Sequence, residues 1–308
     1  MSWRKKPIWL ILAALITLGS FIWLVLLLKD GFIQIMEQGM SLNTPALALS
    51  WILAVAATFI TSQIFFNIMQ ASGARFSSFH EACELNFTAQ VMRHLPGRFF
   101  GVAYQVVKAK HVANTAEWIC GNIAIILLST WLALVFSSII LIALEKNMAL
   151  AFMILISTLS APFIIYGINL LLGHFSSKNQ KIEKFIKIFH AVPKALFSAK
   201  GRRALAWGTI SWCVYAMAWA TFGEALPLES WHDGLILGAL YTLAWAIGFF
   251  SLITPSGLGV RELAFALLAS SYPPEILLFV SVAARLGLML ADFVLGIVFL
   301  VTAKREIL

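Results

Sequence analysis

The chain has 308 residues, of which 61% are hydrophobic and only 12% charged, and its formal net charge is +8. Ordinary globular domains carry roughly a quarter charged residues, so a protein dissolved in water could not cover this much apolar surface. The composition therefore excludes a soluble domain and predicts an all-α, polytopic transmembrane helical bundle. We expect residues 1–308 to form a single integral membrane domain.

Long apolar windows define the expected spans. A hydrocarbon core of about 30 Å needs roughly 20 apolar residues in a helix, and four windows of that length contain no charged residue: 8–28, 45–74, 119–144 and 148–172. Three further spans are expected at 205–222, from Leu235 onward and at 276–302. Together with interrupted apolar segments, the sequence predicts about seven or eight spans.

The basic residues indicate an orientation in the membrane rather than a nucleic-acid partner. Lys and Arg accumulate in cytoplasmic loops, and the basic residues here lie between the expected spans. Arg4, Lys5 and Lys6 precede the first span, and Lys304 and Arg305 follow the last. We therefore expect a multi-pass protein of the bacterial inner membrane with both termini in the cytoplasm.

One connecting segment, 176–203, is basic and amphipathic. Lys178, Lys181, Lys184 and Lys187 alternate with apolar residues spaced by three and four, which predicts a cytoplasmic helix with one apolar face. Such a helix lies at the membrane interface. It can mark the cytoplasmic side, bind anionic lipid headgroups or dock a cytoplasmic enzyme.

No cofactor or metal is predicted. The three cysteines, Cys83, Cys120 and Cys213, form no C-x-x-C pair, and the six histidines show no metal-ligand spacing. The sequence also lacks the G-x-x-x-x-G-K-[ST] run of a P-loop. We therefore expect neither a metal centre nor an ATP-driven mechanism.

The most informative segment interrupts apolar sequence at 254–262. Pro255, Gly257 and Gly259 break a helix and leave backbone groups without partners. At membrane depth such a break is tolerated only where it is buried in protein or lines a wet cavity. We therefore take these three residues as candidates for a binding site.

After the break, the chain can restart as a half-helix over 260–270. The N-terminus of that half-helix carries free N–H groups and the positive end of the helix dipole, which attract an anion such as phosphate. The dipole also favours the charge of Glu262 in the first turn, and Arg261 and Glu262 become candidate binding residues. The alternative is a tight cytoplasmic turn in which both side chains meet water.

An earlier segment has a similar composition, with Pro96, Gly97 and Arg98 between two helical stretches. Paired broken helices in the two halves of a membrane protein indicate a site at a repeat interface. The sequence thus predicts inverted pseudo-repeats at 1–145 and 146–308, and it adds Pro96, Gly97 and Arg98 to the candidate binding residues.

The run P-x-G-x-G-x-x-E, formed by Pro255, Gly257, Gly259 and Glu262, and the earlier Leu-Pro-Gly run resemble the membrane region of lysylphosphatidylglycerol synthases. The likeness covers most of the chain. In the full-length synthases this region is similar to a flippase that moves aminoacylated phospholipid between leaflets, and a separate soluble domain makes that lipid. The resemblance implies lipid movement by a helical membrane domain. No synthetic domain follows the last expected span, so we do not expect synthesis of the lysyl-lipid.

Two charges are expected inside the last span. Arg285 and Asp292 are seven residues apart and fall on one face of a helix. A charge facing lipid costs at least about 2.5 kcal/mol on insertion scales, so this face should point into the protein. Because the two are too far apart for a strong pair, we expect Arg285 to reach Glu262 or a lipid phosphate. The alternative is a structural ion pair that locks two helices together.

These features predict a lipid transporter, or flippase, that moves an anionic phospholipid or a lipid-linked glycan across the inner membrane. Its partners would be the anionic headgroups of membrane lipids. One alternative is an intramembrane glycosyl- or lipid-headgroup transferase, whose acids would come from the loop with Glu224, Glu229 and Asp233. Another is a membrane partner that docks a cytoplasmic enzyme through the basic helix.

Overall fold

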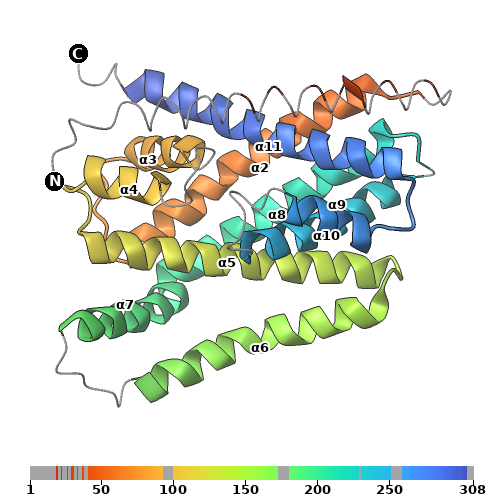
Figure 1. Cartoon of the computed structure of the whole chain (residues 1–308). Coiled ribbons are helices and arrows are strands. Elements are labelled where there is room, and N and C mark those ends of the chain that lie inside the picture. Colours follow the sequence, from red (N-terminus) through yellow and green to blue (C-terminus); the bar gives the residue numbers. More distant parts are fainter. Residues whose placement is uncertain are drawn as a thin grey trace.

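The structure is a computed structural model that describes residues 41–92, 100–172, 180–228, 230–250 and 259–303, with a few isolated positions between 19 and 37. These residues form helices and contain no strand, which confirms the all-α class (Figure 1). In chain order the helices are α2 (Thr44–Ala71), α3 (Phe79–Met92), α4 (Phe100–Lys108), α5 (Thr115–Ala143), α6 (Met148–Leu172), α7 (Gln180–Phe197), α8 (Ala199–Ala225), α9 (Trp231–Phe250), α10 (Val260–Leu268) and α11 (Pro274–Ala303).

Five of the described helices, α2, α5, α6, α9 and α11, are long and apolar enough to cross a membrane. They support a multi-pass membrane protein. The first expected span, 8–28, lies outside the described residues. Helix α8 has 27 residues, but it includes three Trp and two Thr and is not among the five. The predicted number of seven or eight spans is therefore not confirmed.

Helices α2 and α8 form an antiparallel pair. The backbone N–H of Asn43, just before α2, donates to the carbonyl of Ala225 at the end of α8 (3.1 Å). Midway along both helices, the Ser211 hydroxyl donates to the carbonyl of Ala57 (2.9 Å). Contacts at both levels keep the two helices together over half their length or more, and small residues at such an interface let backbones approach closely.

Two helical hairpins each end in a short helix. In the first, α3 runs antiparallel to α4: Gly101 lies against the carbonyl of Ala89, and Gln105 donates to the carbonyl of Leu85 (3.4 Å). The second helix of each hairpin, α4 or α10, has nine residues. The predicted breaks at Pro96 and Pro255 fall between the helices of the hairpins, outside the described residues.

The second hairpin, α9 and α10, is fixed at both ends. Near its closed end, Gly248 lies against the backbone and Cβ of Arg261. At its open end, the Tyr272 hydroxyl donates to a carboxylate oxygen of Asp233 (2.8 Å). Burial raises the pKa of Tyr272, and the hydrogen bond to Asp233 and its charge raise it further. Tyr272 therefore stays protonated and keeps donating this bond at neutral pH.

The basic amphipathic segment divides where one helix was expected. Helix α7 ends at Phe197, and the Ser198 hydroxyl oxygen accepts from the backbone N–H of Gly201 (2.9 Å), which caps the start of α8. A serine in this position ends one helix and begins another. The first turns of α8 therefore carry Lys200, Arg202 and Arg203, so a single helix over 176–203 was wrong for its described part.

Candidate functional site

Helix α10 begins at a glycine with an unusual backbone. Gly259 has φ 81° and ψ −46°, a combination that residues with a side chain adopt only under strain. Its N–H donates to one carboxylate oxygen of Glu262 (2.8 Å). The expected restart of the helix after the break, with Glu262 in its first turn, is confirmed. This end of the helix combines free N–H groups with a capping carboxylate.

The other oxygen of Glu262 binds arginines from two helices. The Arg285 Nη1 atom of α11 lies 2.6 Å from Glu262 Oε1, and the Arg261 Nη2 atom lies 3.6 Å from the same oxygen. The predicted contact of Arg285 with Glu262 is thus confirmed. Because one carboxylate faces two guanidinium groups, this group of three residues, here called the arginine cluster, has a net charge of +1.

The arginine cluster is largely buried. The side chains of Arg261 and Arg285 are 9% and 12% exposed, and that of Glu262 is 34% exposed. In the alternative turn both Arg261 and Glu262 would meet water; the structure buries Arg261 and leaves Glu262 about one-third exposed. Burying charged groups lowers the stability of a fold unless the charges are paired and hydrogen-bonded. We therefore expect the buried arginine cluster to reduce the free energy of unfolding.

Two polar groups beside the arginine cluster have no partner in the described part of the chain. The Arg261 guanidinium lies over the Tyr241 ring, 5.3 Å from its centroid, which is a favourable cation–π distance. Its Nε atom and the Tyr241 hydroxyl are buried without a hydrogen-bond partner among the described residues. Buried polar groups are usually satisfied, so these two atoms are exceptions within the apolar bundle.

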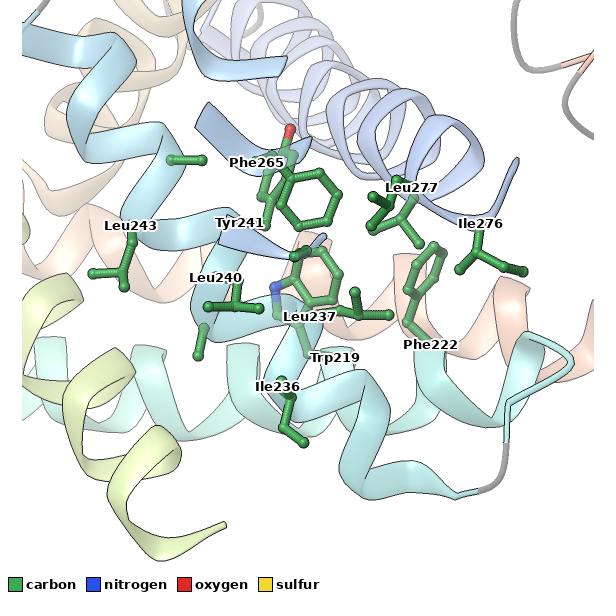
Figure 2. Packing of buried hydrophobic residues seen from close by; sticks show 14 of the residues in the cluster. Trp219, Phe222, Ile236, Leu237, Leu240, Tyr241, Leu243, Phe265, Ile276 and Leu277 are labelled. Carbon is green, nitrogen blue, oxygen red and sulfur yellow. The ribbon is translucent and has the colours of Figure 1, made fainter. Parts of the chain in front are cut away.

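An apolar cluster surrounds Tyr241 and separates the arginine cluster from α8. The Tyr241 ring meets Phe265 at 5.4 Å and Trp219 at 5.5 Å between ring centroids. Figure 2 shows the Tyr241 hydroxyl pointing away from the Trp219 ring. This packing places the charged groups in a low-dielectric setting, where electrostatic interactions are stronger than in water.

Asp292 occupies a different part of α11. It is 4% exposed and lies one turn before Gly296, where α11 packs against Val91 and Phe87 of α3. Of the two predicted charges of the last span, Arg285 binds Glu262 of α10, whereas Asp292 is buried two turns further along α11.

The remaining predicted site residues, Pro96, Gly97, Arg98, Pro255 and Gly257, lie outside the described residues. Of the predicted set, the structure brings together Gly259, Arg261, Glu262 and Arg285.

Sequence analysis missed Tyr241 and Trp219, which support the arginine cluster. Both are aromatic residues inside long helices, a position that is also typical of ordinary core or lipid-facing side chains. It also missed Gln105, which is buried in α4 and accepts from the Asn122 side chain (3.0 Å). Gln105 could have been identified from the sequence as a polar residue within a short, otherwise apolar helix.

The described residues contain no group of three or more His, Cys, Asp or Glu that could hold a metal ion. Comparison with known proteins gives no relative, since no protein-family model, no curated protein and no solved structure matches this chain. The resemblance to the membrane region of lysylphosphatidylglycerol synthases stays a prediction.

Proposed function

We propose that this protein moves an anionic lipid between the two leaflets of a membrane and that the arginine cluster binds the lipid phosphate. The observation that carries the proposal is the net positive charge of the arginine cluster, kept buried in an apolar helical bundle at the start of α10. A phosphate beside Arg285 would gain charge-assisted hydrogen bonds, and the N-terminus of α10 would favour its charge.

The depth of the arginine cluster supports transport rather than surface binding. Arg285 follows Pro274, the first residue of α11, by eleven residues, which is about 16 Å along the helix at 1.5 Å per residue. That distance is about half of a 30 Å hydrocarbon core. Transporter sites typically lie near the bilayer midplane, where broken helices meet.

We further infer that the helices form two inverted repeats, α2–α5 and α8–α11. Each contains a long helix, a shorter helix, a nine-residue helix and a second long helix. In Figure 1 the members of each pair, α2 with α8 and α5 with α11, run in opposite directions. These bounds are narrower than the predicted 1–145 and 146–308, and they leave α6 and α7 as a connection. Rocking of inverted repeats is the usual basis of alternating access.

The charge distribution supports a cytoplasmic location for one end of the bundle. Helices α3, α4 and α7 lie toward the same end in Figure 1, where Lys108, Lys194 and Arg203 are exposed. The opposite end carries the turn at Glu145 and Lys146, whose charges cancel, and the acidic residue Glu224. By the positive-inside rule the basic end faces the cytoplasm. We propose that the membrane is the inner membrane of a bacterium.

The proposal is tested by lipid translocation in proteoliposomes. Fluorescent phosphatidylglycerol in the inner leaflet becomes accessible to a membrane-impermeant reductant only when it crosses. We expect Arg285→Ala to slow translocation at least about tenfold, because about 1.4 kcal/mol of binding to the phosphate would be lost. The matched control is Arg203→Ala, which removes an exposed arginine of α8 and should keep the wild-type rate.

Folding of each variant is checked by size-exclusion chromatography and thermal unfolding, with Arg285→Gln as a second variant if the alanine variant is unstable. A folded wild-type protein that moves no anionic lipid would overturn the proposal. Equal rates for folded Arg285→Ala and wild type would separate the arginine cluster from transport and leave Arg285 and Glu262 as a structural ion pair.

A further inference from the structure

The three side chains of the arginine cluster are unequally exposed. Arg261 and Arg285 are largely buried, whereas about one-third of the Glu262 side chain is accessible. The most accessible member of this positively charged cluster is therefore its carboxylate. An anion that approaches from outside the bundle meets a negative charge beside the two arginines, and like charges repel each other strongly where water is scarce.

Glu262 binds Arg285 in the way that an anionic ligand would. The distance of 2.6 Å between Arg285 Nη1 and Glu262 Oε1 is at the short end of the range for a charge-assisted hydrogen bond. The same oxygen lies 3.6 Å from Arg261 Nη2, which is beyond hydrogen-bond distance. The carboxylate thus satisfies one arginine fully and the other only in part.

A second glutamate shows what the capping role alone requires. Glu117 of α5 and Glu262 of α10 are both the third residue of their helix. Glu117 accepts from the N–H of Asn114 (2.7 Å), as Glu262 accepts from the N–H of Gly259 (2.8 Å). Within the helices that the structure describes, Glu117 forms no ion pair. Capping therefore does not explain the bond to Arg285, and Glu262 can release this arginine while its other oxygen keeps the cap.

We propose that Glu262 and the lipid phosphate compete for Arg285 and that the phosphate replaces the carboxylate when the lipid binds. The inference rests on the proposed function and adds how the arginine cluster is loaded and unloaded. A tetrahedral phosphate presents its oxygens in several directions and can bind two guanidinium groups at once, which the carboxylate does not. On release, the carboxylate returns to Arg285, so the buried arginine is paired at each stage and avoids the cost of an unpaired charge.

The first test compares two substitutions that shorten a capping glutamate and keep its charge. Native mass spectrometry of the full-length protein in detergent measures the affinity for phosphatidylglycerol. We expect Glu262→Asp to bind this lipid about threefold more tightly than wild type, which corresponds to about 0.7 kcal/mol, because the shorter side chain competes less well for Arg285. Glu117→Asp is the matched control and should leave the affinity unchanged. Size-exclusion chromatography and thermal unfolding check that both variants fold.

The second test needs no substitution. A hydrophobic carbodiimide reacts with carboxyl groups that are not held in an ion pair, and mass spectrometry locates the labelled residues. The wild-type protein is labelled in nanodiscs of phosphatidylglycerol and in nanodiscs of a phosphate-free galactosyl diacylglycerol. We expect several-fold more labelling of Glu262 in phosphatidylglycerol, because the phosphate releases it from Arg285. Glu117 should be labelled equally in both lipids and is the internal control.

The outcomes distinguish this inference from the proposed function. Equal or lower labelling of Glu262 in phosphatidylglycerol would mean that the phosphate joins the carboxylate instead of replacing it. Equal affinity of Glu262→Asp and wild type would mean that only the net charge matters. Either result would overturn the competition even if the wild type moves phosphatidylglycerol and Arg285→Ala does not, a result that leaves the proposed function intact. A folded wild type that neither binds nor moves this lipid would overturn both.

Discussion

At the scale of single residues, the site depends on Glu262. Its carboxylate accepts from the Gly259 N–H (2.8 Å) and binds Arg285 (2.6 Å), with Arg261 next to it (3.6 Å). The positive end of the α10 dipole stabilises a carboxylate in this position. Glu262 also separates two like charges that would otherwise repel each other. One positive charge is left over, which is what an anionic ligand requires.

The backbone of Gly259 sets the direction in which α10 starts. We expect Gly259→Ala to destabilise the protein by about 1–3 kcal/mol, because a Cβ is strained at this positive φ. Thermal unfolding in detergent measures the change. The matched control is Gly167→Ala in α6, where a Cβ would meet no atom within 4 Å. That variant should be neutral or up to about 1 kcal/mol more stable, since Ala favours helix over Gly.

Equal melting temperatures for Gly259→Ala and wild type would show that α10 can begin with an ordinary backbone. In that case the position of Glu262 would not depend on the glycine.

At the scale of helices, α6 shows how the bundle accommodates a proline. Pro162 lies inside α6, and because it has no N–H, the carbonyl of Thr158 loses its usual partner within the helix. The indole N–H of Trp131 on α5 donates to that carbonyl (2.9 Å). In a bilayer no water can replace such a bond, so the tryptophan both satisfies the carbonyl and attaches α6 to α5.

A double-mutant cycle tests this pairing. Trp131→Phe should cost about 1 kcal/mol, the order of an interhelical hydrogen bond in a membrane. Pro162→Ala restores the N–H of residue 162, so in that background Trp131→Phe should cost clearly less. The measurement is unfolding in mixed micelles. An equal cost of Trp131→Phe in both backgrounds would mean that the tryptophan acts only by packing.

At the scale of the whole molecule, the distribution of exposed apolar residues fits a membrane. Helix α6 lies at one side of the bundle in Figure 1, and its side chains Phe163, Ile156 and Met153 are largely exposed. In water this surface would favour aggregation. In a bilayer this surface faces lipid. Helix α6, the least buried of the five candidate spans, is therefore compatible with a membrane-spanning position.

The two ends of α6 should lie on opposite sides of the membrane. We expect Lys146→Cys, in the turn before α6, to react with an impermeant maleimide added outside spheroplasts. Lys200→Cys, at the start of α8, should react only after permeabilisation. Both substitutions are made after the three native cysteines are replaced, and the cysteine-free protein is the control. Labelling of both from the same side would contradict the proposed orientation.

Much of the secondary structure could be predicted from the sequence. The expected span at 148–172 coincides with α6, and that at 119–144 differs from α5 by four residues at its start and one at its end. Local signals determine these bounds. Asn114 accepts from the backbone of Glu117 and caps α5 (3.0 Å), and such capping depends only on residues near in the sequence.

The division of the basic segment at Ser198 was not predicted, although serine is a common cap. Serine is also common on the exposed surface of an uninterrupted helix, so a serine in a polar segment does not by itself indicate a helix end. At this division Val192 and Ala195 of α7 are buried in the bundle, and α8 continues beside α2. Ser198 can cap a helix or lie on its surface, and the structure shows the capping arrangement, with the Gly201 N–H donating to its hydroxyl oxygen.

The sequence alone determined that the protein is helical and apolar, that a helix restarts after Gly259, and that Arg285 needs a partner. Each follows from local chemistry: length of apolar runs, the conformational freedom of glycine, and the cost of a charge in lipid. Only the tertiary structure decided that Arg261 is buried over Tyr241 and that Arg261 and Arg285 share the carboxylate of Glu262. Burial and ion pairing depend on which side chains meet across helices, and residues more than a hundred positions apart, such as Ala57 and Ser211, meet only when the whole bundle packs.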